Sequence, residues 1–158
     1  MREIIFLDID GVLNLFSNSY MTASHRDNLC EPHLVKRFNY LCRKIEDIEI
    51  IISSSWRRDM ESCREVLEGA GFLYWEKVAG RVSVSAFADS QKRGEQIHSW
   101  LKLNVSETFM PRVDAKIYII DDEPDGTKEF WPNDFFEVCP AEGLSDKTVQ
   151  RIIERSKL

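Results

Sequence analysis

Hydrophobic positions along this chain gather into five short apolar runs, separated by stretches with helical spacing. The runs occupy residues 3–7, 48–52, 72–78, 116–120 and 135–138. Apolar runs of this length are typical of buried strands in a parallel sheet. We therefore predict a strand at each of these positions.

Between the runs, apolar residues recur at the spacing of amphipathic helices. One helix is predicted over residues 31–44, with Pro32 at its start, and a second from about residue 59 to the glycines at 69–71. Two more helices are predicted after Ser90 and Ser145, whose hydroxyls suit N-caps. Strands that alternate with helices in this way predict an α/β fold, in which helices cover both faces of a parallel sheet.

The chain has no internal repeat and no linker rich in proline, glycine or serine, so we expect one domain over residues 1–158. Residues 14–30 are polar and irregular, and this stretch is too long for a plain turn. Loops of this size are often functional, and we expect a short flap or insert here.

The composition is ordinary for a globular protein, with 43% hydrophobic and 30% charged residues. No apolar run is long enough to span a bilayer, so a cytoplasmic location is predicted. Four cysteines lie far apart, which favours reduced thiols. The net charge of −6 argues against an extended nucleic-acid-binding surface, although adjacent basic pairs such as Arg57-Arg58 leave room for a local basic site.

Polar side chains follow three of the predicted strands directly. Asp8 and Asp10 follow the first, Ser53 follows the second, and Asp121-Asp122 follow the run at residues 116–120. In an open parallel sheet, ligands bind beyond the carboxyl ends of the strands. We therefore expect these side chains to converge on one site.

Carboxylates from different strands repel one another, and they stay ionised together only if a cation lies among them. Because the site offers only oxygen ligands, Mg²⁺ is predicted rather than zinc. The acidic residues around the ion would be Asp8, Asp10, Asp121 and Asp122. Which of the last two contacts the ion directly stays open at this point.

A carboxylate beside Mg²⁺ can attack phosphorus and form an acyl phosphate, a role predicted for Asp8. Asp10, two residues later, can protonate the leaving oxygen and then activate the water that hydrolyses the intermediate. Gly11 lets the backbone turn tightly enough to aim both carboxylates at one point.

The phosphoryl oxygens need hydroxyl and cationic partners. Ser53 is the predicted hydroxyl, with Ser54 as its substitute if the strand ends one residue later. Lys92 and Arg93 stand at a predicted helix start, and either could supply the cation.

Together these residues resemble the motifs of haloacid-dehalogenase-type (HAD) phosphatases. The matching segments are Asp8-Ile9-Asp10-Gly11-Val12-Leu13, Ser53, Lys92 or Arg93, and Ile119-Ile120-Asp121-Asp122 with Asp125. More narrowly, the chain resembles the phosphatase-like domain of the Swiss-army-knife RNA repair proteins, which are related to polynucleotide kinase-phosphatases. The segments that carry this narrower resemblance are Ile52-Ser53-Ser54-Ser55-Trp56-Arg57, Arg93-Gly94-x-x-Ile97-x-x-Trp100-Leu101 and Gly143-Leu144.

The resemblance implies a three-layer Rossmann-like sheet, an aspartyl-phosphate intermediate and one Mg²⁺. The ligands would be Asp8, the main-chain carbonyl of Asp10 and an Asp of the 121–122 pair. The stretch before the first helix is too short for a large cap domain. One departure is Val12, where threonine is common in the family.

The function predicted from these features is a Mg²⁺-dependent phosphomonoesterase that acts on a nucleotide or on a nucleic-acid terminal phosphate. Trp56 and Arg57 would then face the substrate. In the alternative interpretation, Trp56 packs in the core and Arg57 lies in solvent. A receiver-like phospho-acceptor is an alternative, but receivers carry their acidic pair on the first strand and their phospho-acceptor on a later one. A catalytically inactive interaction module is a third hypothesis, although no catalytic group is missing.

Overall fold

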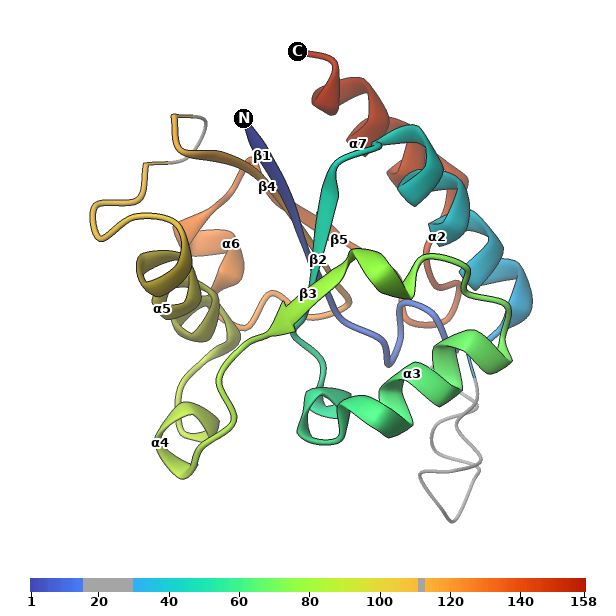
Figure 1. Ribbon diagram of the computed structural model, residues 1–158, viewed down its shortest axis with the longest axis horizontal. Helices are drawn as coiled ribbons and strands as arrows, with labels where there is room; N and C mark the ends of the chain where they lie inside the picture. Colours follow the sequence, from blue (N-terminus) through green and yellow to red (C-terminus); the bar gives the residue numbers. More distant parts are fainter. Residues whose placement is uncertain (16–29, 111–112) are drawn as a thin grey trace.

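A computed structural model of the chain describes residues 1–15, 30–110 and 113–158. Its centre is a five-stranded parallel sheet in the order β3-β2-β1-β4-β5 (Figure 1). The strands are β1 (Arg2–Leu7), β2 (Ile48–Ile52), β3 (Val78–Arg81), β4 (Ala115–Asp121) and β5 (Phe135–Glu137). The strand order reverses between β1 and β4, which is where open α/β sheets form their ligand sites.

Helices cover both faces of the sheet (Figure 1). On one side lie α2 (Pro32–Lys44), α3 (Met60–Gly69) and α7 (Asp146–Ser156), and on the other α5 (Arg93–Asn104) and α6 (Thr127–Phe130). The predicted three-layer, Rossmann-like α/β fold is therefore confirmed, and the described residues contain no large cap domain. None of the helices in the described ranges is both long and apolar enough to cross a membrane.

The two cores follow from the alternation of side chains along the strands. In β1, Ile5 and Leu7 face the layer of α2, α3 and α7, whereas Ile4 and Phe6 face the layer of α5. All four are fully buried. A strand buried on both faces reads as a continuous apolar run, which is why β1 is evident in the sequence.

The predicted strand over residues 72–78 is wrong. Residues Trp75–Lys77 form a 3-10 turn, η3, and β3 begins only at Val78. Phe72 lies outside the sheet, and its ring stacks on that of Phe38 of α2, with ring centroids 5.5 Å apart. Phe72, Tyr74 and Trp75 therefore pack in or against the hydrophobic core instead of pairing in the sheet, and Leu73 is exposed.

The predicted N-cap at Ser90 is also wrong, whereas the one at Ser145 is confirmed by a 3.1 Å bond from the Thr148 amide. A short helix, α4 (Ala86–Asp89), precedes α5, and the Ser90 hydroxyl donates back to the Phe87 carbonyl at its end. The helix α5 begins three residues after the serine, at Arg93, and its N-cap residue is Lys92. The predicted insert at residues 14–30 falls largely on residues 16–29, outside the described ranges, and the single-domain organisation stays a prediction.

Candidate active site

The carboxyl ends of β2, β1 and β4 meet at one edge of the sheet. The Ser53 amide donates to the Leu7 carbonyl at 2.9 Å, and the Asp8 amide donates to the Ile120 carbonyl at 3.0 Å. These bonds continue the strand ladders by one residue, so Asp8 lies between its neighbours at the usual strand spacing of about 4.8 Å. The sheet therefore brings Ser53, Asp8 and Asp121 side by side.

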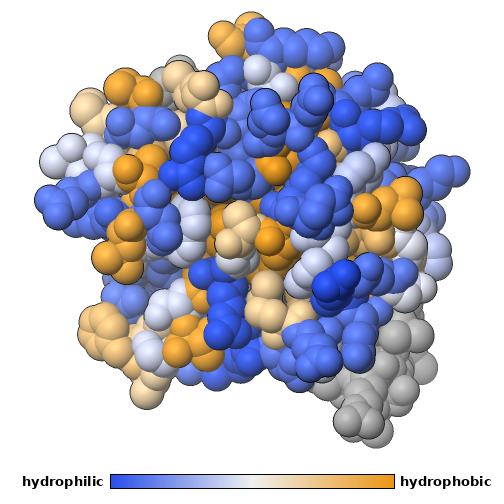
Figure 2. Space-filling model, in the orientation of Figure 1, coloured by the Kyte–Doolittle hydropathy of each residue, from blue (hydrophilic) through white to orange (hydrophobic). Residues whose placement is uncertain are grey.

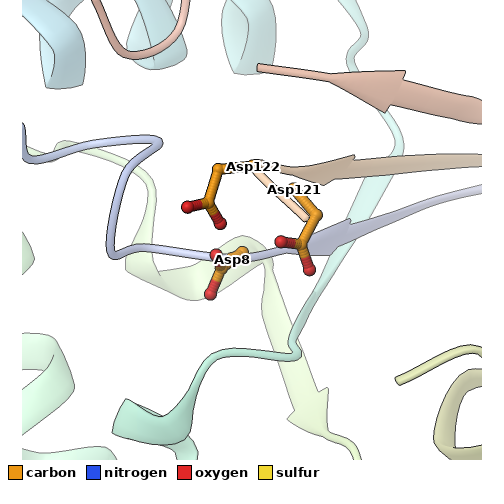
Figure 3. A group of neighbouring side chains, drawn as sticks. All are labelled: Asp8, Asp121 and Asp122. Carbon is orange, nitrogen blue, oxygen red and sulfur yellow. The ribbon is translucent and has the colours of Figure 1, made fainter. Parts of the chain in front are cut away.

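Three carboxylates form the acidic part of the site. Asp8, Asp121 and Asp122 each offer an oxygen, and these oxygens all lie within 4.8 Å of one another. Figure 3 shows the three side chains turned toward a common point, Asp8 just beyond β1 and the other two at the end of β4. Asp8 and Asp121 are buried and Asp122 is half-buried. The side chain of Asp10 is not part of this group.

The pKa values of two of these carboxyl groups, Asp8 and Asp121, are raised, chiefly by burial. Burial raises the pKa of Asp8 well above its usual value, and repulsion from Asp121 adds to the shift. Burial raises the pKa of Asp121 to about 7, and Asp122 adds to that rise. Buried acidic oxygens gathered this closely form a donor set suited to a hard divalent cation such as Mg²⁺, whose positive charge favours their ionised form.

Asp10 is held in place by two donors to a single oxygen. Its Oδ1 accepts a 2.8 Å bond from Asn14 Nδ2 and a 3.2 Å bond from Trp56 Nε1. Asn14 is buried, and its Oδ1 also accepts the Gly11 amide at 3.0 Å. The role of Asn14 was missed in the sequence, where the only signal is an amide side chain four residues after an acidic one.

The turn directly after Asp10 requires glycine. Gly11 has a φ of 80°, a conformation that L side chains rarely adopt. A Cβ at this position would lie 2.5 Å from Oδ2 of Asp122. The loop after β1 thus packs directly against the acidic pair at the end of β4.

The two serines after β2 have different environments. Ser54 Oγ accepts the Trp56 amide at 3.2 Å and so caps the 3-10 turn η2 (Ser55–Arg58). Ser53 Oγ is fully buried and has no hydrogen-bond partner among the described residues. Buried hydroxyls are normally satisfied, so a buried hydroxyl without a partner beside a ligand site is suited to bind the ligand.

Arg93 is the basic residue that faces the carboxylates. Its positive charge lowers the pKa values of both Asp8 and Asp121, against the larger effect of burial. Its Nη1 is buried without a hydrogen-bond partner in the described part of the chain. Lys92 is exposed, so the structure favours Arg93 over Lys92 as the cation of the site.

The start of α5 is fixed on the loop that follows β4. Asp125 Oδ2 accepts the Arg93 amide at 2.9 Å, and the Asp125 carbonyl accepts the Gly94 amide at 3.1 Å. A Cβ on Gly94 would lie 2.6 Å from the Gly126 carbonyl. This close approach couples the position of Arg93 to that of the Asp121–Asp122 pair.

Comparison with known families identifies the chain. The model of the family described as the HAD domain in Swiss Army Knife RNA repair proteins matches residues 4–149. The chain belongs to this family. No curated protein and no solved structure matches the chain closely enough to count as a relative. Every site residue described above lies inside the matched span of this HAD domain.

In this HAD domain, Trp56 and Arg57 do not form the predicted substrate-facing pair. Trp56 is 7% exposed, because its ring packs in the core and its N–H reaches Asp10. Arg57 is buried as well, with its guanidinium donating to the carbonyls of Ser54 and Ser83. The tight turn of η2 tucks both side chains inward, so the alternative of a solvated Arg57 is also wrong.

Proposed function

We propose that this HAD domain is a Mg²⁺-dependent phosphomonoesterase that acts through an aspartyl phosphate on Asp8. The observation that carries the proposal is the pairing of two halves in one site. One half is the group of three carboxylates within 4.8 Å of one another. The other is a buried hydroxyl and a buried guanidinium nitrogen, Ser53 Oγ and Arg93 Nη1, which lack partners among the described residues. The first half suits a cation and the second suits phosphoryl oxygens.

The residues fit Mg²⁺ because every available donor is an oxygen. Asp8, Asp121 and Asp122 would hold the ion, together with the main-chain carbonyl of Asp10. When bound, the ion supplies positive charge that offsets the negative charge developing on the phosphoryl group.

The side chains of the site would divide the reaction between them. A carboxylate oxygen of Asp8 attacks phosphorus, and the bond from phosphorus to the leaving oxygen breaks as the acyl phosphate forms. Asp10 donates its proton to the leaving oxygen. It then takes a proton from the water that attacks the phosphorus, which releases inorganic phosphate and restores Asp8. Acid–base help of this kind typically contributes about 10²–10⁴-fold in rate.

Ser53 and Arg93 would bind the phosphoryl oxygens throughout both steps. Such donors are effective because they are already oriented before charge develops. Family membership supports a phosphorylated nucleic-acid end as the substrate class, since the matched family is named for RNA repair proteins. The receiver-like alternative has no specific support, because Asp8 and Asp10 come before the Asp121–Asp122 pair in the chain.

The test is phosphate release with and without Mg²⁺ from p-nitrophenyl phosphate and from oligonucleotides phosphorylated at the 3′ or the 5′ end. Wild-type protein is expected to turn over at least one of these substrates only when Mg²⁺ is present. The Asp8→Asn variant, which keeps the shape of the side chain, should fall to the background rate. If the wild type does not exceed that variant on any substrate, the proposal is wrong.

A further inference from the structure

A cluster of arginines extends from the phosphate site along the edge of the sheet. Arg81, at the end of β3, donates from Nη1 to the Arg57 carbonyl at 2.6 Å. Arg58 and Arg57 share the carboxylate of Asp89, at 2.8 and 3.3 Å. Burial lowers the pKa of Arg57, and the charges of Arg93, Arg58 and Arg81 lower it further. These arginines are therefore close enough to one another to repel, with one carboxylate between them.

Strand register fixes where this cluster lies. Arg81 is paired with Ile52, and Ile52 is paired with Leu7, the residue before Asp8. Two strand spacings of about 4.8 Å place the Arg81 backbone about 10 Å from the end of β1. Arg58 belongs to η2, which begins two residues after Ser53. The cluster thus starts at the phosphate site and runs toward the sheet edge at β3.

The short helix α4 carries an exposed aromatic residue two positions before Asp89, the carboxylate that Arg57 and Arg58 share. Phe87 is 74% exposed and Val84, just before the helix, is 38% exposed. Figure 2 shows apolar side chains at the surface over α4, at the lower left. A single exposed phenylalanine on a flexible loop would carry little meaning, so what matters is how firmly α4 is held.

Contacts from two other elements, α5 and η2, and a cap of its own hold α4 in place. Gln96 of α5 donates from Nε2 to the Ala88 carbonyl through a buried 2.7 Å bond. Asp89, the last residue of α4, is held by the two arginines of η2. Ser85 caps the helix by accepting the Ala88 amide at 3.0 Å. The Phe87 ring therefore stands on a fixed base and faces solvent.

We propose that Arg58, Arg81 and Phe87, here called the α4 surface, bind the single-stranded nucleic acid next to the phosphate that is removed. This inference rests on the proposed function and names the residues that hold the strand. Arg58 and Arg81 contact backbone phosphates, for which the guanidinium fork is well suited. Phe87 stacks on a base, in the way that single-strand-binding proteins combine a basic groove with aromatic rings.

The chemistry of the surface favours a nucleic acid over an acidic peptide. The chain as a whole carries a net charge of −6, so a local concentration of arginines is not a by-product of composition. A peptide phosphate would use the cations but would leave Phe87 without a flat partner to stack on. The sequence predicted that Trp56 would stack on a base of the substrate; because Trp56 is buried, we assign this role to the exposed ring of Phe87.

Binding is tested by fluorescence anisotropy with a labelled single-stranded oligonucleotide that carries a terminal phosphate, in the Asp8→Asn background so that it is not consumed. Phe87→Ala should weaken binding by about 5- to 150-fold, the range measured for lost base stacking. The double variant Arg58→Ala, Arg81→Ala should reduce the salt dependence of binding. The slope of log K against the logarithm of salt concentration should become shallower by about 1.4, that is, by about 0.7 for each lost phosphate contact. Leu103→Ala and Arg43→Ala are the controls, because Leu103 is exposed near the C-terminal end of α5 and Arg43 lies in the last turn of α2, which leads into the amino end of β2 and not the carboxyl ends that form the site. Neither control should change affinity or salt slope.

A kinetic readout separates this inference from the function on which it rests. In the otherwise wild-type protein, the ratio of kcat/KM for the oligonucleotide to that for p-nitrophenyl phosphate should fall about tenfold or more in Phe87→Ala. Absence of wild-type turnover on both substrates would overturn the phosphatase proposal, while the anisotropy assay would still test the surface. Unchanged affinity and an unchanged ratio in Phe87→Ala and in the double arginine variant would overturn the surface alone. Equal affinity for a phosphopeptide, lost in the same variants, would assign the surface to a different partner and refute the nucleic-acid proposal.

Discussion

Asp121 has to be ionised to bind the proposed metal ion, whereas its burial in the fold disfavours the ionised form. Burial and the neighbouring Asp122 raise the pKa of Asp121 from 3.8 to about 7. A raised acid pKa means that the ionised form is less stable in the folded protein than in the unfolded chain. At about 1.4 kcal/mol for each pKa unit, ionising this side chain lowers the free energy of unfolding by about 4 kcal/mol.

The direction of the pH dependence follows from the same shift. The contribution of the protonated Asp121 carboxyl to the free energy of unfolding is fully present below about pH 4, where this group is protonated in both the folded and the unfolded chain. It is lost as the pH rises through about 7, because the folded protein then has to accommodate the charge. In the absence of divalent cations, the wild-type protein should therefore be less stable at pH 8 than at pH 5.

We predict that Asp121→Asn stabilises the metal-free protein at pH 8. The amide keeps the shape of the side chain and the Oδ1 that accepts the Glu123 amide at 3.0 Å, but removes the charge. The gain should approach about 4 kcal/mol, which for a domain of this size raises Tm by roughly 8–16 °C. The gain should shrink toward pH 4, where the wild-type carboxyl is neutral.

Thermal unfolding followed by circular dichroism in EDTA, at pH 5 and pH 8, measures this effect. The same series with Mg²⁺ should raise the Tm of the wild type at pH 8, since a ligand at 100 times its Kd contributes about 2.7 kcal/mol. The variant should respond little. Asp47→Asn, at an exposed turn before β2, is the control and should change neither Tm nor its pH dependence. If Asp121→Asn is no more stable than the wild type at pH 8 in EDTA, the reasoning from burial is wrong.

Three further predictions follow from contacts in the site. Gly11→Ala should reduce both the stability and the Mg²⁺-induced rise in Tm, because the new Cβ would meet Asp122. Gly71→Ala is the control: Gly71 also has a positive φ but open space around it, so this change should reduce the stability alone. Tm with and without Mg²⁺ measures both effects. Ser53→Ala should lower kcat/KM about tenfold or more with little loss of stability, since the Ser53 hydroxyl has no hydrogen-bond partner in the described residues. Ser54→Ala should instead lower the free energy of unfolding by about 1 kcal/mol, because it removes a helix cap. Equal effects of the two changes on kcat/KM would contradict this division of roles. Trp56→Phe keeps the ring in the core but removes the donor to Asp10, and should lower kcat about tenfold at unchanged KM; a change in KM alone would argue against a positioning role.

Much of the fold and the acidic site could be predicted because both depend on local patterns. The strands β1, β2 and β4 are buried on both faces, so their apolar runs are continuous and their ends are sharp. In parallel strands the carboxyl ends share one edge, so residues placed directly after the runs converge whatever the loops do. Asp8, Ser53 and Asp121 were accessible to prediction for this reason.

The remaining features depend on contacts between distant segments, which a single sequence does not display. The run at residues 72–78 is apolar because Phe72 packs on Phe38, and its pattern cannot be told from that of a strand. The inward turn of η2 buries Arg57 against Ser83, which lies 26 residues later. Asn14 looks like an ordinary loop residue until its bonds to Asp10 and Gly11 are seen.

The central claim is that Asp8 carries the phosphoryl group. The most direct measurement is to add a phosphomonoester substrate with Mg²⁺ to the Asp10→Asn variant, quench within the first turnover, and reduce any acyl phosphate with borohydride. Mass spectrometry of the peptide that contains residues 1–15 then locates the modified side chain. The account predicts that Asp8 is converted to homoserine, and that the conversion depends on both substrate and Mg²⁺. Release of phosphate by the wild type with no modification of Asp8, or with modification of another carboxylate, would contradict it.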